Sequence, residues 1–544
     1  MRRALKWLIG IGAVVAVLLI VAAIALPRLV DTPRVQGMIA SSASQAIGRP
    51  VKFESLSVRL FPLPAVELHK LEVAEDPQFG TAPFLTLETG RIYLRLRPLL
   101  GGRVEFGDIT LERPRIALIQ HADGHLNVAS LAPASESRTA PRPGRSGGGA
   151  AGGAAAVVLS QVKIASGTVT YLTLGKGTTP TPYRVENLDL TLTSQASQIN
   201  AKGTLRVNPG DLLVKLTDGV VTLNGARPPL ESPLRGRVGI EGKDVEPLVA
   251  ASAGPSPAIA GPIKGDFTLS GTLGAPRASG TVELASLRVT QTSAACPEPR
   301  RRTLSLGPLK LAAVSWDGAR LQSRPATTSL AGGAISTNLT ATVDRGVHLQ
   351  LGDLSIKGLP AEKVLVDFLC EGYAVTGPLD LTGGLKANAG DLWNTLDGSG
   401  RLKLGPGKVV GPQALTLIES LTRIAGAVSS VLSADVPRAV TASPTDFESI
   451  TGTYQIVAGV LTTRDLLYTS RVIKVGVVGD YGLGSGRMNM DLRVQHARGE
   501  LRAHLGGTAA APTIRVDPAS VSTNVTREEL ETGIQDLLNR FRRR

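Results

Sequence analysis

RIYLRLRPLLGG, residues 91–102, alternates apolar and polar side chains over its first half. A period of two is typical of a β-strand that has one apolar and one solvated face. The apolar positions are Ile92, Leu94 and Leu96. The stretch therefore predicts a sheet whose apolar face is covered either by the protein's own core or by an apolar ligand that binds and leaves.

Length and composition favour an extended β protein over a compact enzyme. The chain has 544 residues, with 61 Gly and 35 Pro but only 3% aromatic residues. Frequent Gly and Pro predict many turns, and scarce aromatic residues leave few of the bulky side chains that fill compact cores. The length predicts several domains or one elongated domain built by repetition. A formal charge of +14 favours an anionic partner: nucleic acid, phospholipid or lipopolysaccharide.

The N-terminus predicts a membrane anchor. Residues 7–26 form an uncharged apolar run, and 20 residues at about 1.5 Å each reach the roughly 30 Å of a hydrocarbon core. Three cations precede the run, which favours a cytoplasmic N-terminus and an exported remainder. The alternative is a cleaved signal peptide, because Ala23-Ile24-Ala25 is a small-residue triplet. Either interpretation exports the bulk of the chain and argues against a nucleic-acid partner.

Two cysteines suit an oxidising compartment. A disulfide between Cys296 and Cys370 would close a long loop and stabilise the fold by a few kcal/mol. The alternative is a pair of unbonded buried thiols, and the sequence leaves both open. Their separation resembles no metal site.

Composition shifts predict six segments. A helix over 32–47 with Pro33 in its first turn and Gly48 as its stop follows the anchor, and further helical patterns lie at 360–370, 412–432 and 526–541. The last, with its basic tail, either docks on the protein's own sheet or lies on an anionic membrane. The predicted segments are 1–30, cytoplasmic tip and anchor; 31–131, helix plus β region; 132–156, Gly/Ala/Pro-rich linker; 157–350, middle repetitive β region; 351–518, C-terminal β region with helical insertions; and 519–544, basic amphipathic helix.

Internal echoes suggest that one strand-turn unit recurs. IKGDFTLSGTL at 263–273 resembles VTGPLDLTGGL at 375–385, and LSGTLGAP at 269–276 resembles LGGTAAAP at 505–512. Recurrences of this kind are typical of solenoids and extended sheets. The alternative is that Gly-rich turns look alike in any protein.

Catalytic signatures are missing from the sequence. No phosphate-loop or H-E-x-x-H motif is present. Gly147, Gly149 and Gly152 formally satisfy a dinucleotide fingerprint, but they lie in the linker without a strand before or a helix after them. His121 and His125 flank a predicted Asp-Gly hairpin turn, which does not favour a metal site. The sequence predicts neither an enzyme nor a cofactor.

The order of sequence blocks resembles the AsmA family of Gram-negative envelope proteins. The N-terminal blocks are IGRPV at 47–51, the long stretch 56–118 and DGHLNVASL at 123–131. The C-terminal blocks are LDGSGRLKLGPGKVVG at 396–411, FESITGTYQIVAGVLTTRDLLYTS at 447–470 and GTAAAPTIRVDP at 507–518. Residues of about 160–350 resemble the family only in their general strand-turn pattern.

The resemblance implies a specific fold and role. AsmA-like proteins are anchored in the inner membrane, project into the periplasm and resemble bridge-like lipid transfer proteins with a repeating β-groove. It implies a mainly β fold: an elongated, curled antiparallel sheet with an apolar inner face for acyl chains. The implied partners are phospholipid, the inner membrane and an outer-membrane or periplasmic protein, and the implied role is outer-membrane biogenesis without catalysis.

Seven apolar residues are the candidates for lining such a groove. Alternation alone favours an ordinary sandwich core, and the family resemblance favours a lipid groove. The candidates are Ile92, Leu94, Leu96, Phe267, Leu269, Leu402 and Leu404. Three functions are in competition: a lipid-transfer groove, a periplasmic scaffold that assists outer-membrane protein or lipopolysaccharide assembly, and an envelope hydrolase.

Overall fold

The protein is described by a computed structural model. The described residues are 33–59, 63–95, 106–121, 125–130, 161–173, 183–195, 197–223, 229–294, 296–343, 346–415, 445–471, 473–496 and 499–517. Several predicted segments lie outside them: the membrane span, the linker, most of the helix at 412–432 and the C-terminal helix. Within the described ranges no helix is long and apolar enough to cross a membrane.

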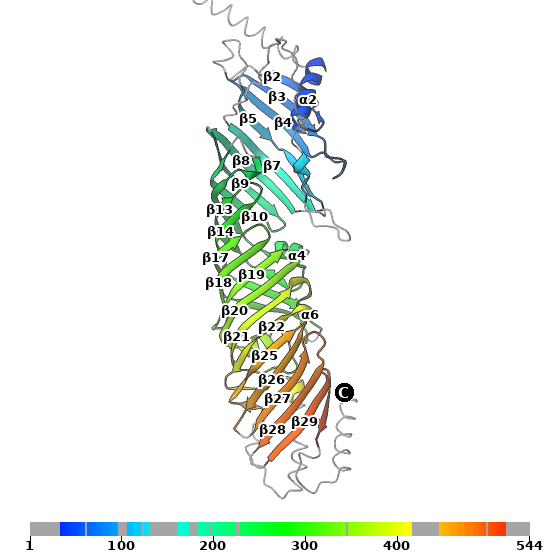
Figure 1. The fold of residues 1–544 in the computed structure, drawn as a ribbon, viewed down its shortest axis with the longest axis vertical. Helices are drawn as coiled ribbons and strands as arrows, with labels where there is room; N and C mark the ends of the chain where they lie inside the picture. Colours follow the sequence, from blue (N-terminus) through cyan, green and yellow to red (C-terminus); the bar gives the residue numbers. More distant parts are fainter. Residues whose placement is uncertain are drawn as a thin grey trace, which may run out of the picture. The chain divides into compact units, whose positions relative to one another are not determined.

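The fold is mainly β, as predicted. Twenty-five strands belong to one hydrogen-bonded sheet, and two smaller sheets have three strands and two strands. The chain divides into two compact units: unit 1 comprises residues 1–241 with 268–276, and unit 2 comprises 242–267 with 277–544. Figure 1 shows α2 beside β2, β3 and β4 of unit 1, and it shows the strands of unit 2 following one another in sequence order.

Unit 1 begins with a helix and continues as strands. Its elements are α2 (Pro33–Ile47), β1 (Val51–Lys52), β2 (Ser55–Arg59), β3 (Ala65–Val73), β4 (Leu85–Leu94), β5 (Phe106–Glu112), β6 (Arg115–Gln120), η1 (Asn127–Ser130), β7 (Gln161–Thr173), β8 (Tyr183–Gln195), β9 (Gln198–Asn208), β10 (Leu212–Thr222), η2 (Pro229–Glu231) and β11 (Leu234–Gly242). β13 (Ile263–Gly271) contributes residues to both units.

Unit 2 holds the remaining elements. They are α4 (Glu246–Ala253), β12 (Ala258–Ala260), β14 (Pro276–Leu284), β15 (Leu287–Thr292), β16 (Arg301–Leu306), β17 (Leu309–Trp316), β18 (Arg320–Leu330), β19 (Gly333–Val343), β20 (Val347–Pro360), α5 (Ala361–Leu365), β21 (Pro378–Asn388), η3 (Ala389–Asp391), α6 (Leu392–Thr395), β22 (Asp397–Leu404), β23 (Gly407–Lys408), β24 (Asp446–Phe447), β25 (Ser449–Val457), β26 (Val460–Thr469), β27 (Lys474–Gly482), β28 (Met488–His496), β29 (Gly499–Thr508) and β30 (Ala511–Val516).

The helix predicted at 32–47 is confirmed as α2. Pro33 stands in its first turn, where a missing N–H costs no hydrogen bond. Gly48 ends it with a φ of 78°, and its N–H donates to the Ser44 carbonyl oxygen at 2.9 Å. Ala43 and Ile47 pack against a buried cluster on the sheet, so α2 is fixed to unit 1 by its apolar face.

The sheet is mixed, which corrects the predicted antiparallel sheet. β5 and β6 both pair with β7 in parallel, whereas the other strand pairs with a known register are antiparallel. Parallel neighbours need a connection of a dozen or more residues, and the chain between Gln120 and Gln161 is long enough to provide it. Gln120 and Leu126, on either side of the hairpin turn predicted between His121 and His125, form an antiparallel bridge, and the turn residues 122–124 lie outside the described residues.

Bulges interrupt the long strands near their middles. Asn187, Asp218 and Asp353 have φ values of 50°, 52° and 49°, and the strand register shifts beside each of them. Asn and Asp tolerate this left-handed conformation better than other residues that carry a Cβ. A bulge bends its strand and adds one residue, so the apolar side chains change between odd and even positions there. The alternation in the sequence breaks at the same points.

One of the two sequence echoes is a turn used twice. Gly271 and Gly507 have φ values of 90° and 83°. In each turn the following threonine accepts a hydrogen bond on Oγ1 from an alanine N–H three residues later, at 3.2 Å in both cases. Glycine adopts a positive φ without strain, which explains the shared Gly-Thr pair.

Candidate functional site

Unit 1 carries a row of apolar side chains that crosses seven strands, from β2 to β9. Each member stands directly opposite the next in the strand register, so all lie on one face. All are half-buried. The unit 1 row consists of Val58, Val66, Ile92, Ile109, Val162, Leu192 and Ala201. The sequence candidate Ile92 is thus one member of a continuous apolar line.

Unit 2 carries two rows of the same kind. The short row crosses five strands and consists of Ile335, Ile356, Leu381, Leu402 and Gly452. The long row crosses eight strands and consists of Leu339, Leu351, Leu385, Gly398, Ile456, Leu461, Tyr481 and Met488. All members of the short row and most of the long row are half-buried, whereas Ile456 and Met488 are buried.

The opposite face of unit 2 carries a polar row. A line of polar side chains runs in the same register. On each strand that it shares with the short row, its member is the residue adjacent to the short-row residue. The polar row consists of Lys310, Thr327, Ser336, Ser355, Thr382, Arg401 and Thr453. Near its end the backbone N–H and the hydroxyl of Thr453 donate to Asp465, which lowers the pKa of that exposed carboxyl. The two faces therefore differ as the alternation predicts.

The polar face also has a shallow depression of about 570 Å³. It forms where two glycines leave space, and one ionisable side chain, Asp353, lines it. The lining residues are Asp353, Leu354, Ser355, Thr382, Gly383, Gly384 and Ser399.

Leu402 and Leu404 differ in burial although they lie on the same side of β22. Leu404 is only 4% exposed and packs in a closed cluster with Ala361, Val409 and Phe447. Leu402 is half-buried and stands opposite Leu381 and Gly452. The structure thus places Leu404 in a core and Leu402 on the part of the apolar face that is only partly covered.

The other candidates occupy β13 and the region of β4. Phe267 and Leu269 are half-buried and alternate with exposed polar residues along β13. Leu94 is the last residue of β4 and stands opposite Phe106. Leu96 lies outside the described residues.

The packing of Tyr454 on the apolar face is a feature that alternation does not reveal. Its strand register places it opposite Gly400, which in turn is opposite Gly383. The hydroxyl oxygen is close to both glycines: a Cβ built there would lie 2.6 Å from it at Gly400 and 2.8 Å at Gly383. The ring therefore lies over two glycine positions, on β22 and β21, that have no side chain. That Tyr454, Gly400 and Gly383 stand opposite one another on three strands could be found only once the strand pairing was known.

The hydroxyl of Tyr454 is buried and, among the described residues, has no hydrogen-bond partner. Burial also raises the pKa of this phenol. Replacing Tyr454 with phenylalanine is expected to raise the free energy of unfolding by about 1 kcal/mol, because an unsatisfied polar group is removed while the ring stays. Urea denaturation of the full chain measures this change. A loss of more than about 1 kcal/mol would show that the hydroxyl has a partner.

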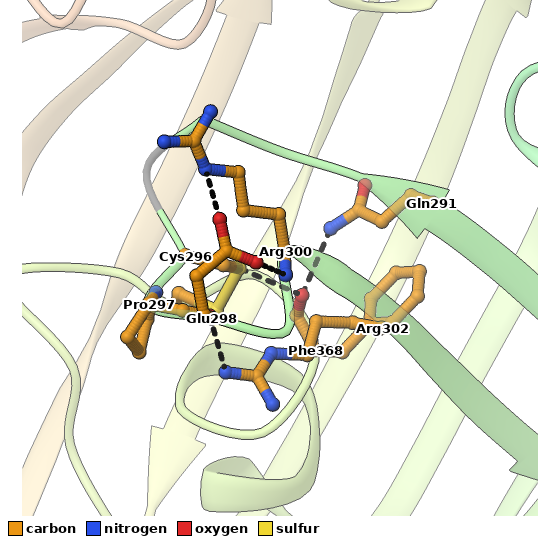
Figure 2. Close-up of a disulfide and its surroundings, with 8 residues drawn as sticks. Gln291, Cys296, Pro297, Glu298, Arg300, Arg302 and Phe368 are labelled. Atoms are coloured by element: carbon orange, nitrogen blue, oxygen red, sulfur yellow. Dashed lines mark hydrogen bonds and ion pairs between the residues drawn. A yellow bond between two sulfur atoms is a disulfide. The ribbon is translucent and has the colours of Figure 1, made fainter.

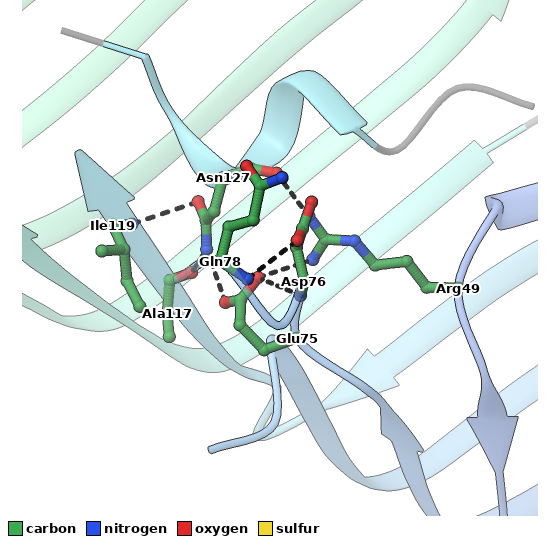
Figure 3. A network of polar contacts seen from close by, with 7 residues as sticks. All are labelled: Arg49, Glu75, Asp76, Gln78, Ala117, Ile119 and Asn127. Carbon is green, nitrogen blue, oxygen red and sulfur yellow. Dashed lines mark hydrogen bonds and ion pairs between the residues drawn. The ribbon is translucent and has the colours of Figure 1, made fainter. Parts of the chain in front are cut away.

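Three of the N-terminal sequence blocks meet in a buried polar network (Figure 3). Arg49 Nη1 lies 2.9 Å from Glu75 Oε1, and Arg49 Nη2 donates to the Asn127 carbonyl oxygen. Asn127 Nδ2 donates to Glu75 Oε2 at 2.7 Å and to the Ala117 carbonyl at 2.8 Å. Arg49 also lies 5.0 Å above the ring of Phe84. The network joins the end of α2, the β3–β4 loop and η1.

Cys296 and Cys370 form a disulfide, which decides between the two interpretations of the sequence. The bond joins the loop before β16 to the segment after α5 (Figure 2). Beside it, Gln291 Nε2 donates to the Phe368 carbonyl at 2.9 Å.

Comparison with known proteins identifies a family. The model of the AsmA family matches residues 1–259, which includes α2, the polar network and the unit 1 row. Neither the curated proteins nor the solved structures contain a match to the chain.

Proposed function

The chain belongs to the AsmA family through residues 1–259, and from this premise we propose that it carries phospholipid along its apolar rows. The proposed route runs between the inner and outer membranes and supports outer-membrane biogenesis. In this proposal the chain is anchored in the inner membrane by residues 7–26, with the N-terminus in the cytoplasm and the bulk in the periplasm. A periplasmic or outer-membrane protein would receive the lipid, and no step is catalytic.

The observation that carries the proposal is the half-buried state of the rows. In an ordinary sandwich core, a second layer would bury such side chains almost completely. The unit 1 row spans six strand spacings of about 4.8 Å, or roughly 29 Å. One leaflet of a bilayer's hydrocarbon core is about 15 Å thick, half of the roughly 30 Å core. The row is therefore longer than one acyl chain and offers it continuous apolar contact.

The side chains in the rows suit a moving ligand. Leu, Ile, Val and Ala give dispersion contacts that are similar at each step along the sheet. Such contacts hold an acyl chain without fixing its position. The polar row on the opposite face keeps that face in water.

A periplasmic scaffold is the second candidate. The closed cluster around Leu404 favours it, because that part of the apolar face is covered by the protein itself. A scaffold requires the same closure along all the rows, and it predicts that surface loops carry the function.

The test is photo-crosslinking in living cells with a reactive amino acid at Leu402 or Ile92. Lys403 is the matched control, because it is the next residue on β22 and is exposed. We expect phospholipid adducts at the two apolar positions and none at Lys403, as judged by mass spectrometry. Adducts only with the protein itself at both apolar positions would reject the lipid route and favour the scaffold.

A further inference from the structure

Four connecting segments of unit 2 lie at one end of the strands. They join β11 to β13, β14 to β17, β20 to β21, and β22 to β25. Successive antiparallel strands run in opposite directions, so these four connections all lie at the same ends of the strands. We name their described residues edge segments 1 to 4: residues 243–262; 285–294 with 296–308; 361–377; and 405–415 with 445–448.

Edge segments 1 and 2 are joined by a small sheet. β12 of segment 1 pairs with β15 of segment 2, which pairs with β16. The Ala285 N–H also donates to the Pro262 carbonyl at 3.3 Å. The two segments therefore form one hydrogen-bonded layer.

Edge segments 2 and 3 are joined by the disulfide. Cys296 of segment 2 is bonded to Cys370 of segment 3, and Gln291 donates to the Phe368 carbonyl beside it. Figure 2 shows both links at one place, with the strand of Gln291 running past the turn that carries Phe368.

Edge segments 3 and 4 are joined through their backbones. Thr376 N–H donates to the Lys408 carbonyl at 2.8 Å, and Ala414 N–H donates to the Gly372 carbonyl at 3.0 Å. A Cβ on Gly411 would collide with the Gly372 carbonyl oxygen, so the two backbones approach as closely as glycine allows. The four segments are thus linked in order, and we call them together the edge wall.

The edge wall covers the ends of the apolar face. Val409 and Phe447 of segment 4 and Ala361 of segment 3 form the cluster that buries Leu404, the last residue of β22. Tyr373 of segment 3 packs against this cluster and also against the cluster of β28 to β30, and its hydroxyl donates to the Ala509 carbonyl at 3.4 Å. Two positions earlier on β22, Leu402 stays half-buried. The wall therefore stops beside the short row.

We propose that the edge wall is the second side of the lipid site in unit 2 and that the disulfide holds its two halves together. The proposal rests on the proposed function and adds contact residues outside the sheet. Leu365, at the end of α5, is half-buried and packs against the cluster that contains Leu404. An acyl chain lying on the short row would meet the sheet on one side and wall residues such as Leu365 on the other.

The test adds a third photo-crosslinking position, Leu365, to the full chain. Lys363 is the control on the same helix, since it is exposed and forms an ion pair with Asp367 at 2.8 Å. We expect phospholipid adducts at Leu365 and Leu402 but not at Lys363. Adducts at Leu402 without any at Leu365 would overturn the wall and leave the proposed function standing. If both positions lack lipid, the proposed function fails in unit 2 and the inference fails with it.

The role of the disulfide is tested with the double variant Cys296→Ser, Cys370→Ser. The lipid adduct at Leu365 is expected to fall severalfold while the adduct at Leu402 persists. An unchanged yield at Leu365 would show that the disulfide does not hold the wall. Gln291→Ala removes only the neighbouring hydrogen bond and is the variant to use if the double variant does not fold. A reduced adduct yield at Leu365 would support the link between segments 2 and 3. An unchanged yield would contradict it.

Discussion

Replacing Glu75 with alanine is expected to lower the free energy of unfolding around β3 and β4 by about 3–5 kcal/mol. The substitution leaves the guanidinium of Arg49 buried without its carboxylate, with the Arg49 side chain only 4% exposed. It also removes one of the two acceptors of the side-chain amide of Asn127, which is fully buried. Hydrogen exchange at the amides of β3 and β4 measures the loss in the full chain, because it reports on this region separately from unit 2.

A double substitution separates the ion pair from its burial. Arg49→Met with Glu75→Leu removes both charges and keeps apolar volume, so its cost should be smaller than that of Glu75→Ala alone. Glu88→Ala is a matched surface control, since Glu88 pairs with Arg113 where both side chains are more than half exposed, and its cost should stay below about 1 kcal/mol. Equal losses for Glu75→Ala and Glu88→Ala would show that the network does not hold α2 to the sheet.

Replacing Leu404 with alanine is expected to cost about 2–5 kcal/mol, and replacing Leu402 with alanine clearly less. Both side chains lie on the same side of β22, so the substitution is chemically the same and only the covering differs. Leu404→Ala leaves a cavity among Ala361, Val409 and Phe447, whereas Leu402→Ala shortens a half-buried side chain. Urea denaturation of the full chain, followed by hydrogen exchange at β22, measures both changes.

For phospholipid adducts we expect the reverse order: a substitution at Leu402 should matter more than one at Leu404. Leu402→Asp is expected to abolish phospholipid adducts at Leu381, which stands opposite it, and at Ile356 on the next strand of the short row, while the fold remains. Lys403→Asp, on the opposite face, is the control and should leave those adducts unchanged. Equal stability losses for the two leucine-to-alanine variants would mean that Leu402 is also in a closed core.

The sequence predicts much of the fold because alternation is a local signal. The stretch around Ile92 indicates a strand with one apolar face, and the structure confirms the strand as β4. The cap at Gly48 and the shared Gly-Thr turns are equally local. The bulges leave a trace too: the apolar positions of β20 are Leu349 and Leu351 before Asp353, and Leu354 and Ile356 after it. A change of parity inside one strand is a signal for a bulge.

Other parts of the site depend on contacts between distant residues. Arg49 is separated from Glu75 by 26 positions and from Asn127 by 78, and nothing in a single sequence links them. The burial of Leu404 results from the edge segments, which alternation along β22 does not describe. Parallel pairing of β5 and β6 with β7 likewise follows from the connection, not from the strands themselves.

Each strand contributes one side chain to the unit 1 row, and neighbouring strands keep the row in register. Adding or removing one hairpin would therefore lengthen or shorten the row by two strand spacings, about 9.6 Å, without changing any remaining contact along it. A slip of one residue would instead turn every side chain of a strand to the opposite face. The length of the row can therefore change in whole hairpins, whereas a change of one residue keeps the row in register only where a bulge absorbs it.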